Sequence, residues 1–248
     1  MRRVHSPMIR LFHVSDVHFG REDREAVAWF DAAVHAERPD AIIMTGDLTM
    51  RARTAEFEAA AKWLQGLERP VTVEVGNHDL PAYNLFARFL MPYRRYKSLE
   101  KMIERPLEIR GLNVVPMKTT ARFQLRNWSK GRVSDGSLAR AVAGVAAADK
   151  SGLTLIACHH PLIEAGTHAS AKTRGGANAL AALAGAGADA VLSGHVHDPF
   201  DLEKDVGGRT VRLIGAGTLS SRTRATPPSF NELRVEGRRL EVVPRVMA

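Results

Sequence analysis

Residues 71–79 read Val-Thr-Val-Glu-Val-Gly-Asn-His-Asp, and this stretch decides how the rest of the chain can be arranged. The alternating run of β-branched residues predicts a strand, and Gly76 predicts a tight turn where that strand ends. Asn77 and His78 then lie at the carboxyl end of the strand. Open α/β sheets bind their ligands at this end, so we expect functional side chains here.

Four other apolar runs end in the same kinds of side chain. Residues 9–15 precede Asp16 and His18, residues 41–45 precede Asp47, residues 153–158 precede His159 and His160, and residues 190–193 precede His195 and His197. Each apolar run predicts a buried strand. Because the carboxyl ends of parallel strands share one sheet edge, we expect these side chains to converge on a single cleft.

These strand ends supply two carboxylates, one amide oxygen and several imidazoles, while the chain contains a single cysteine. Such a mixed oxygen and nitrogen ligand set favours Mn, Fe, Zn or Co over a zinc ion held by thiolates. The set is too large for one ion, whereas two ions bridged by a carboxylate would use it fully. A two-metal site suits in-line displacement at phosphorus, because it stabilises the attacking and leaving oxygens and supplies a metal-bound hydroxide.

Five motifs follow one another along the chain: Asp16-x-His18, Gly46-Asp47, Gly76-Asn77-His78-Asp79, His159 and Gly194-His195-x-His197. In this order they resemble the motifs of the calcineurin-like metallophosphoesterase superfamily. All five are intact and span residues 16–197, which is a specific signal for the superfamily and a weak one for the substrate. The chain length and Ser229-Phe230-Asn231, which comes after residues 217–221, make the chain most similar to the bacterial branch that includes cyclic-nucleotide phosphodiesterases.

The resemblance implies a role for each of these side chains. A first metal would be held by Asp16, His18 and His197. Asp47 would bridge to a second metal, which would also be held by Asn77, His159 and His195. His78 would stay unligated near the leaving oxygen, where it acts as a general acid or stabilises charge on the phosphoryl group. The implied cofactors are two divalent or mixed-valence transition metals.

Two further residues are candidates for substrate binding. Arg51 lies in the loop that follows Asp47, where it could reach a phosphate, and an exposed basic loop is the alternative. His160 follows His159, and adjacent side chains on an extended chain point to opposite sides, so we expect His159 alone to face the metals. His160 would then orient the substrate or donate a hydrogen bond to a ligand, unless it only fixes the turn at Pro161.

The segments between the motifs predict helices. Helical spacing of apolar residues predicts helices over residues 22–38 and 54–67, with Thr54 as the N-cap of the second helix. A helical apolar stripe over residues 82–104 is broken at Pro92. An Ala-rich helix that runs to about residue 149 could be capped by Ser134 or Asp135.

Short strand-like runs predict a second sheet: residues 107–109, 112–115, 211–214, 230–235 and 240–243. The expected fold class is α/β, a four-layer α/β/β/α sandwich of two mixed sheets with helices on the outer faces. The family resemblance implies the same layers. We expect residues 1–248 to form one metallophosphoesterase domain.

The composition excludes several classes of protein. A length of 248 residues, with 45% hydrophobic and 25% charged residues, is ordinary for a globular α/β protein. No apolar run approaches the roughly 18 residues that span a bilayer, and no apolar segment follows the basic first residues, so no secretory signal is expected. One cysteine, Cys158, leaves no intrachain disulfide, and the cytoplasm is the expected location. We expect Cys158 to be a buried core thiol and not a nucleophile.

The net charge of +8 and the pI near 10 fit either a solvated basic surface or attraction of a small phosphorylated substrate. Nucleic acid is an alternative partner that we do not favour, because no aromatic residues alternate with the arginines of the C-terminal quarter. Residues 82–104 could wall the substrate pocket or form an oligomer contact. Residues 164–177, which include His168, are expected to form a mobile loop over the site.

These observations predict a dinuclear metal-dependent phosphoesterase that hydrolyses small phosphodiesters, such as a cyclic nucleotide or a glycerophosphodiester, by attack of a metal hydroxide. The preference for diesters rests on the branch that the chain resembles. The enzymatic alternatives are a nuclease and a phosphomonoesterase or protein phosphatase. An alternative of another class is a non-catalytic scaffold of the same fold, against which the complete set of metal positions argues.

Overall fold

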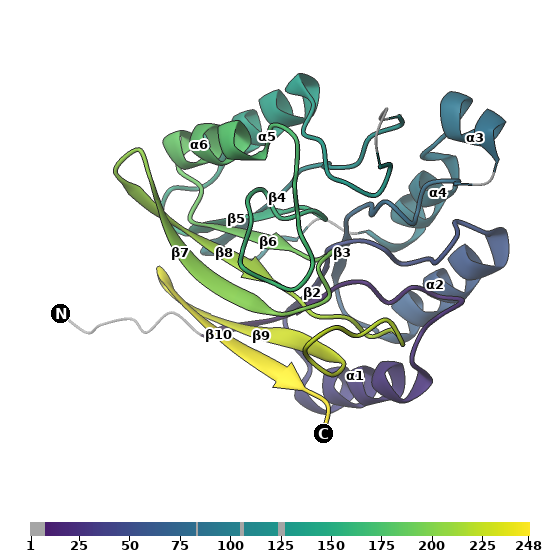
Figure 1. Cartoon of the computed structure of the whole chain (residues 1–248). Helices are drawn as coiled ribbons and strands as arrows, with labels where there is room; N and C mark the ends of the chain where they lie inside the picture. Colours follow the sequence, from purple (N-terminus) through teal and green to yellow (C-terminus); the bar gives the residue numbers. More distant parts are fainter. Residues whose placement is uncertain (1–7, 83, 105–106, 124–126) are drawn as a thin grey trace.

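The computed structural model describes residues 8–82, 84–104, 107–123 and 127–248 and contains two five-stranded mixed sheets (Figure 1). The first sheet has the strand order β10 (Arg239–Val246), β9 (Ser229–Glu236), β1 (Ile9–Val14), β2 (Ala41–Met44) and β3 (Val71–Val73). Strands β1, β2 and β3 are parallel, whereas β9 and β10 extend the sheet in antiparallel fashion. The helical segments between the parallel strands are the crossovers that this arrangement requires.

The second sheet has the strand order β4 (Leu112–Pro116), β5 (Leu153–Ala157), β6 (Ala190–Ser193), β8 (Arg209–Gly215) and β7 (Phe200–Val206). Its first four strands are parallel, and β7 pairs antiparallel with β8. The apolar pattern does not indicate β7, because the five residues between its ends are exposed and mostly charged. Charged side chains are typical of an edge strand that must not pair with another chain.

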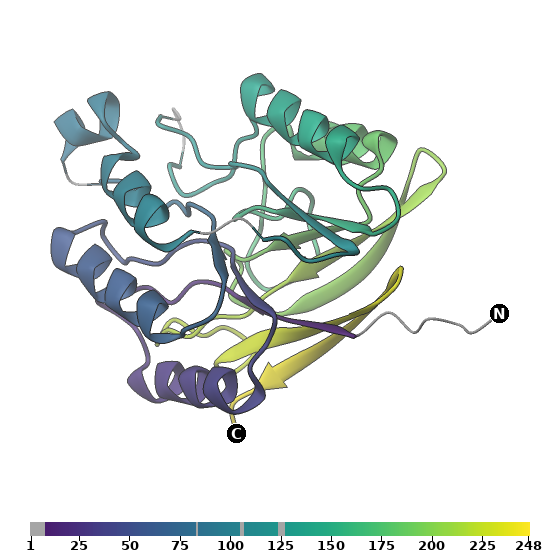
Figure 2. The same ribbon diagram turned by 180° about the vertical axis from the view of Figure 1, so that it is seen from behind.

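Helices cover the outer faces of both sheets (Figures 1 and 2). Helices α1 (Arg24–Glu37), α2 (Thr54–Gly66) and α4 (Arg94–Ile103) pack on the first sheet, and α5 (Asp135–Ala147) and α6 (Gly176–Ala186) pack on the second. A third apolar layer lies between the two sheets and includes Leu11, Ile43, Leu155, Leu192 and Ile214. The four-layer α/β/β/α sandwich with two mixed sheets is therefore confirmed.

The five strands that end in the motif residues do not lie in one sheet. Strands β1, β2 and β3 belong to the first sheet, and β5 and β6 belong to the second. The expectation of a single shared sheet edge is therefore wrong. The two edges still meet, because Nδ1 of His159 hydrogen-bonds to the carbonyl of Thr45 and the backbone N–H of His195 donates to the carboxylate of Asp16.

The start of α2 differs from the expectation that Thr54 caps it. Thr54 is the first residue of the helix, and Arg53 occupies the N-cap position. The carboxylate of Glu56 accepts hydrogen bonds from the backbone N–H groups of Arg51 and Arg53, so an acidic side chain in the first turn satisfies donors that precede the helix. In α5, by contrast, Ser134, one of the two expected candidates, is the N-cap, and Asp135 is the first residue of the helix.

Residues 82–104 form two helices, α3 (Leu85–Leu90) and α4, separated at Pro92 as the sequence predicts. Tyr83, part of the predicted stripe, lies outside the described residues. Residues 107–109 are not a strand, which corrects that expectation. Within the described part of the chain, no helix combines the length and the apolar character needed to cross a bilayer.

Candidate metal centre

The motif residues sit in tight turns directly after their strands. The parallel pairing of β1 and β2 continues into these turns, since the N–H of Asp16 donates to the carbonyl of Gly46 and that of His18 donates to the carbonyl of Asp47, both at 3.0 Å. Left-handed backbone conformations with φ between 52° and 70° occur at Asp16, His18, Asp47, His195 and His197. This conformation is uncommon for residues other than glycine, and such strain is concentrated at functional sites.

Two glycines of the motifs allow the turns to approach one another. A Cβ atom on Gly76 would lie 2.0 Å from Oδ1 of Asp47, and one on Gly194 would lie 2.5 Å from Oδ2 of Asp16. Both distances are far shorter than any contact that atoms tolerate. Glycine at these positions is therefore a steric requirement for bringing the turns of β2 and β3, and those of β1 and β6, into contact.

Asp16, His18 and His197 form the first cluster of candidate ligands. Nε2 of His197 lies 3.1 Å from Oδ1 of Asp16, and Nε2 of His18 lies 3.6 Å from the same oxygen. The two Nε2 atoms are 3.3 Å apart. All three side chains are buried, so these polar atoms face one another and are shielded from solvent.

The second cluster comprises Asp47, Asn77, His159 and His195. Nε2 of His159 lies 3.3 Å from Oδ2 of Asp47 and 3.2 Å from Oδ1 of Asn77. The ring of His195 is 5.3 Å from that of His159. Oδ2 of Asp47 also lies 3.8 Å from Nε2 of His18, so Asp47 stands between the two clusters. The structure thus brings all seven predicted ligands together.

The second nitrogen of several rings contacts a backbone carbonyl. These Nδ1 contacts join His18 to Thr49, His159 to Thr45 and His197 to Arg222. A carbonyl only accepts hydrogen bonds, so each Nδ1 must carry the proton, and in the neutral ring Nε2 carries the lone pair. This arrangement fixes the tautomer that binds metals through Nε2 and orients the ring.

The contact between Asp16 and His197 shows that the centre suits metal ions. Among the described residues, no hydrogen bond reaches Oδ1 of Asp16, although this oxygen is buried. It lies 3.1 Å from Nε2 of His197. The lone pairs of this oxygen and this nitrogen repel one another unless a proton or a cation is bound between them. His/Asp groups that could hold a metal ion recur through both clusters. Oxygen and imidazole donors of this kind suit transition metals.

The protonation of the metal-free centre is set by charge. Burial would raise the pKa of Asp47, but the charges of His159 and His78 outweigh burial and hold this pKa well below its ordinary value. Burial would lower the pKa of His159, but the charge of Asp47 and the hydrogen bond to it raise this pKa to about 9. Burial and the charge of His159 lower the pKa of His195 to about 3, which keeps that ring neutral. Metal binding must therefore displace a proton from His159.

His78 lies beside both clusters. Its backbone N–H donates to Oδ1 of Asp47 at 2.8 Å, and its Nδ1 donates to the carbonyl of Met50 at 2.8 Å. In the neutral ring, Nε2 of His78 carries the lone pair, and it lies 3.1 Å from Nη1 of Arg222. A ring nitrogen of His78 also falls within 4.8 Å of ligand atoms on His18 and Asp47. The ring is thus fixed at one nitrogen and presents the other to the centre.

Arg222 is the functional candidate that the sequence analysis missed, because it was considered only as part of the basic C-terminal quarter. Its Nη1 contacts Nε2 of His18 at 3.3 Å as well as that of His78. The segment is anchored by Thr218, whose hydroxyl donates to the carbonyl of Asp16 at 2.6 Å. One signal could have found Arg222: it closely follows β8, another parallel strand whose carboxyl end faces this centre.

His160 is not on the side opposite to His159. Its ring lies 4.7 Å from that of His159 and 4.4 Å from that of His195, because the chain has left the extended strand at this point. Its Nε2 donates to the carbonyl of Ser129, and its Nδ1 contacts the hydroxyl of Thr119, each at 3.0 Å. The expected alternation is therefore wrong. The buried ring ties Thr119 and Ser129 to the centre.

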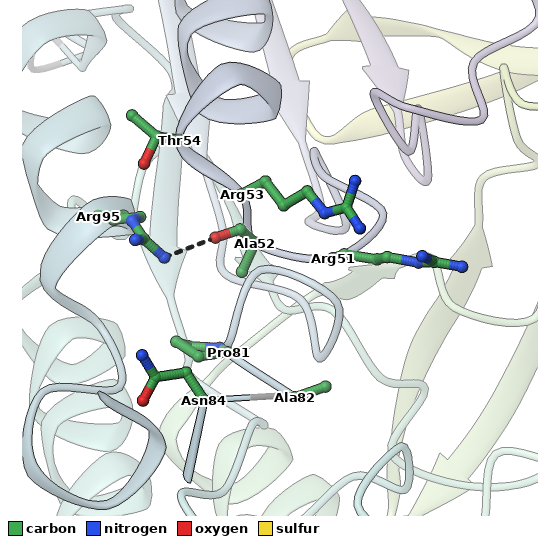
Figure 3. Close-up of a pocket in the computed structure, with 8 residues that line it drawn as sticks. All are labelled: Arg51, Ala52, Arg53, Thr54, Pro81, Ala82, Asn84 and Arg95. Carbon is green, nitrogen blue, oxygen red and sulfur yellow. Dashed lines mark hydrogen bonds between the residues drawn. The ribbon is translucent and has the colours of Figure 1, made fainter. Parts of the chain in front are cut away.

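The other sequence candidates lie around the centre. Arg51 is exposed and lines a cavity beside it, shown in Figure 3. Residues 164–177 are held by Glu164, whose carboxylate accepts from the hydroxyl of Ser170 and from two backbone N–H groups. His168 is exposed and belongs to none of the metal-ligand groups found among the described residues. Cys158 is buried, as expected, and burial raises the pKa of its thiol.

Comparisons with known proteins agree with this geometry. Residues 9–199 match the family described as calcineurin-like phosphoesterase. Over 93 residues the chain is 32% identical to the glycerophosphodiester phosphodiesterase GpdQ of Enterobacter lignolyticus (strain SCF1), a match that covers 33% of this chain and 33% of that protein. The chain therefore covers about a third of the length of this curated relative.

Solved structures share the fold at low sequence identity. A dimetal phosphatase from Danio rerio superposes with a TM-score of 0.68 and 13% identity, covering 98% of this chain and all of that one. The purple acid phosphatase PPD1 from yellow lupin (Lupinus luteus) seeds superposes with a TM-score of 0.65 and 13% identity, covering 97% of this chain and 52% of that one. With the family match extending from β1 past His197, the chain belongs to the calcineurin-like phosphoesterase family.

Proposed function

We propose that this protein is a dinuclear metal-dependent phosphodiesterase that hydrolyses small phosphodiesters. The observation that carries the proposal is the position of Asp47 between two clusters of buried ligands, 3.3 Å from Nε2 of His159 and 3.8 Å from Nε2 of His18. A carboxylate between two such clusters suits a bridge between two ions. Two bound cations polarise the phosphoryl oxygens and activate the attacking water.

The ligand assignment follows the two clusters. Asp16, His18 and His197 would hold the first metal, and Asn77, His159 and His195 would hold the second, with Asp47 available to both. The donors are carboxylate, amide and imidazole groups, so Mn, Fe, Zn and Co are all accommodated. The backbone carbonyls that accept from the Nδ1 atoms of these rings keep each Nε2 directed at its ion.

His78 and Arg222 act on the phosphoryl group. The bond from Nδ1 of His78 to the carbonyl of Met50 fixes the ring, and the doubly protonated ring donates the proton on its Nε2 to the leaving alkoxide. Arg222, held next to His78, donates from its guanidinium to a phosphoryl oxygen and stabilises the charge that develops there. Neither residue needs to be a metal ligand for these roles.

The preference for a diester is supported by the similarity to a protein named glycerophosphodiester phosphodiesterase. A cyclic nucleotide or a glycerophosphodiester is the substrate class we expect, and a basic chain attracts such anions. We further propose that residues 1–248 act as one metallophosphoesterase domain, that a small phosphorylated molecule is its partner, and that it works in the cytoplasm, as the single buried cysteine suggests.

The test is hydrolysis of bis(p-nitrophenyl) phosphate and of p-nitrophenyl phosphate by the same protein, with Mn added and with a chelator as the control. We expect cleavage of the diester, loss of this cleavage with the chelator, and slower cleavage of the monoester. The variant Asp47→Ala, purified in parallel, controls for contaminating phosphatases.

The remaining outcomes contradict the proposal in different ways. Faster cleavage of the monoester would indicate a phosphatase. Cleavage of single-stranded DNA or RNA, with neither chromogenic ester cleaved, would indicate a nuclease. A purified protein that binds no Mn and cleaves no phosphoester would indicate a non-catalytic scaffold.

A further inference from the structure

A basic cavity of about 510 Å³ lies beside the metal centre, between the loop after β2, the loop after β3 and helix α4 (Figure 3). It is lined by Arg51, Ala52, Arg53, Thr54, Pro81, Ala82, Asn84 and Arg95, and we call it the arginine cavity. Three of these eight described residues are arginines, and none is acidic. Its volume is within the range of pockets that bind small ligands, so it can hold an anionic group with part of the molecule attached to it.

The arginine cavity is built on the same two loops as the metal centre. One loop carries Asp47 and continues to Arg51 and Arg53, and the other carries His78 and continues to Pro81. The carbonyl of Met50, which accepts from Nδ1 of His78, directly precedes Arg51. The cavity therefore begins one residue away from a group that positions His78.

The two loops are tied together by Thr49 and Asp79. The carboxylate of Asp79 accepts from the N–H of Thr49 at 2.9 Å, from its hydroxyl at 3.0 Å and from the N–H of Gly76 at 2.9 Å. The hydroxyl of Thr49 also accepts from the N–H of Ala52 at 3.2 Å. Because these bonds are buried, the relative position of the metal centre and the cavity is fixed.

Helix α4 also holds the loop that forms one wall of the arginine cavity. Nη1 of Arg95, on α4, donates to the carbonyl of Ala52 at 2.9 Å, which is the contact drawn in Figure 3. Glu56 accepts from the backbone N–H groups of Arg51 and Arg53, so its charge is engaged by the loop and does not line the cavity. The planar guanidinium of arginine donates paired hydrogen bonds to oxyanions, so positive charge on preorganised arginines favours carboxylate and phosphate groups.

A second, smaller cavity of about 160 Å³ shares four lining residues with the arginine cavity: Ala52, Pro81, Asn84 and Arg95. It adds apolar side chains, including Phe86 and Met91, to the lining, together with Arg94 and with Asp79, whose carboxylate is engaged by Thr49 and Gly76. The two cavities thus form one surface that is basic at one end and partly apolar at the other. A simple inorganic anion needs no apolar wall, whereas an anionic group on a larger organic molecule does.

We propose that the arginine cavity binds a second anionic group of the substrate, a phosphate or carboxylate that is separate from the phosphodiester at the metal centre. This inference rests on the proposed phosphodiesterase function and narrows its substrate to diesters that carry such a group. Arg53 and Arg95 bind the anion. Arg51 lies between Asp47 of the metal centre and Arg53 along the loop.

The kinetic test compares matched p-nitrophenyl phosphodiesters. In each pair the second ester group is an alkyl chain, which is neutral in one member and ends in a phosphate or carboxylate in the other. The length of the alkyl chain varies from pair to pair. We expect a terminal anion on a chain of suitable length to lower KM about tenfold, as expected for new charge-assisted hydrogen bonds. Comparing phosphate with carboxylate shows which anion the cavity prefers. No advantage from either anion at any chain length contradicts the proposal.

The variants Arg53→Gln and Arg95→Gln should remove most of this advantage, measured as the ratio of kcat/KM for the anionic and neutral diesters. The matched control is Arg110→Gln. Arg110 is exposed and precedes β4, at the amino end of the parallel strands and away from the metal centre. An unchanged ratio in both cavity variants contradicts the proposal, and thermal melting verifies that each variant is folded.

A binding measurement separates this inference from the proposed function, because it needs no turnover. Inorganic phosphate and, in a separate experiment, acetate are titrated by calorimetry into the metal-free 248-residue chain carrying Arg222→Gln, which removes the cation next to His78. Adding Arg53→Gln or Arg95→Gln should weaken binding at least about fivefold. If the protein cleaves no diester but shows this loss, the proposed function fails and the anion site stands. Binding that is absent, or equal in all variants, overturns the anion site.

Discussion

Nη1 of Arg222 lies 3.1 Å from Nε2 of His78, although 144 residues separate the two in the sequence. His78 belongs to the turn after β3 in the first sheet, and Arg222 follows β8 in the second. The pair therefore spans the line where the two sheets meet. It places a permanent positive charge next to the one motif histidine to which we assign no metal.

Replacement of Arg222 by Gln should lower kcat/KM for a phosphodiester about 100-fold, the cost of removing one donor to a developing oxyanion. Arg222→Lys keeps the charge but loses the planar fork, so its loss should be smaller. Arg224→Gln is the matched control, since Arg224 is exposed two residues further along the chain. Metal content should remain equal in all three variants. A loss of metal in Arg222→Gln would assign the residue to metal binding instead.

His78→Ala should retain both metals and lose about 100- to 10,000-fold in kcat, the range for removal of a general acid. Asp47→Ala should lose metal as well as activity, because it removes the carboxylate between the clusters. Elemental analysis of the two purified variants, alongside steady-state kinetics, checks both expectations. Equal loss of metal in the two variants would show that His78 is itself a ligand.

Removal of the metals should lower the melting temperature. Bound ions stabilise the folded state by an amount set by their concentration over Kd, about 2.7 kcal/mol at one hundred times Kd. For a chain of this size that corresponds to roughly 5–10 °C. Differential scanning fluorimetry with Mn and with a chelator measures the shift. Asp47→Ala is the control, and a shift of the same size in this variant would place the ion elsewhere.

Glu74 should make the protein less stable as the pH rises. Burial, with the charges of Glu104 and Glu100, raises its pKa well above the ordinary value, and the pKa of Glu104 is raised to about 7 by burial and by Glu100. His159 opposes the shift of Glu74, and Tyr96 also lies nearby. Between the unfolded and folded pKa values the folded chain holds a proton that the unfolded chain has lost, so the free energy of unfolding falls through this range.

Glu74→Gln should therefore raise the melting temperature at about pH 8 and change it little at about pH 4.5, where the folded chain holds the proton and the unfolded chain is only half ionised. Melting curves of the metal-free protein across this range provide the measurement. Glu108→Gln, at an exposed position, is the control. The same change in melting temperature at both pH values would contradict this prediction, because it would show that Glu74 has the same protonation state in the folded and the unfolded chain.

Cys158 should resist thiol reagents until the protein unfolds. Its side chain is fully buried, its Sγ contacts the carbonyl of His160 at 3.4 Å, and burial raises its pKa, so little thiolate forms. Labelling with a chromogenic disulfide should be slow in buffer and complete in denaturant. Fast labelling of the folded protein would contradict the assignment of Cys158 to the core.

The side chains that converge on the candidate metal centre could be predicted from the sequence because each is placed by its own strand end. An apolar run followed by Asp, Asn or His, after a glycine in the runs that lead to Asp47, Asn77 and His195, specifies a strand, a turn and a polar side chain at the carboxyl end, without reference to the rest of the chain. Asn77 and His78 follow β3 in this way, and His195 and His197 follow β6. The chemistry of the donors then indicated the kind of metal. The four layers followed from the same periodicities.

Other features depend on contacts between segments that the sequence does not relate. The division of the motif strands between two sheets, the ring of His160 beside His195, and the guanidinium of Arg222 beside His78 all arise from packing at the junction of the sheets. The arginine cavity likewise needs α4 to bring Arg95 to the loop after β2. Strand patterns fix which side chains are polar and at which end they stand. Only the packing of distant segments, driven by burial of the three apolar layers, fixes which of them meet.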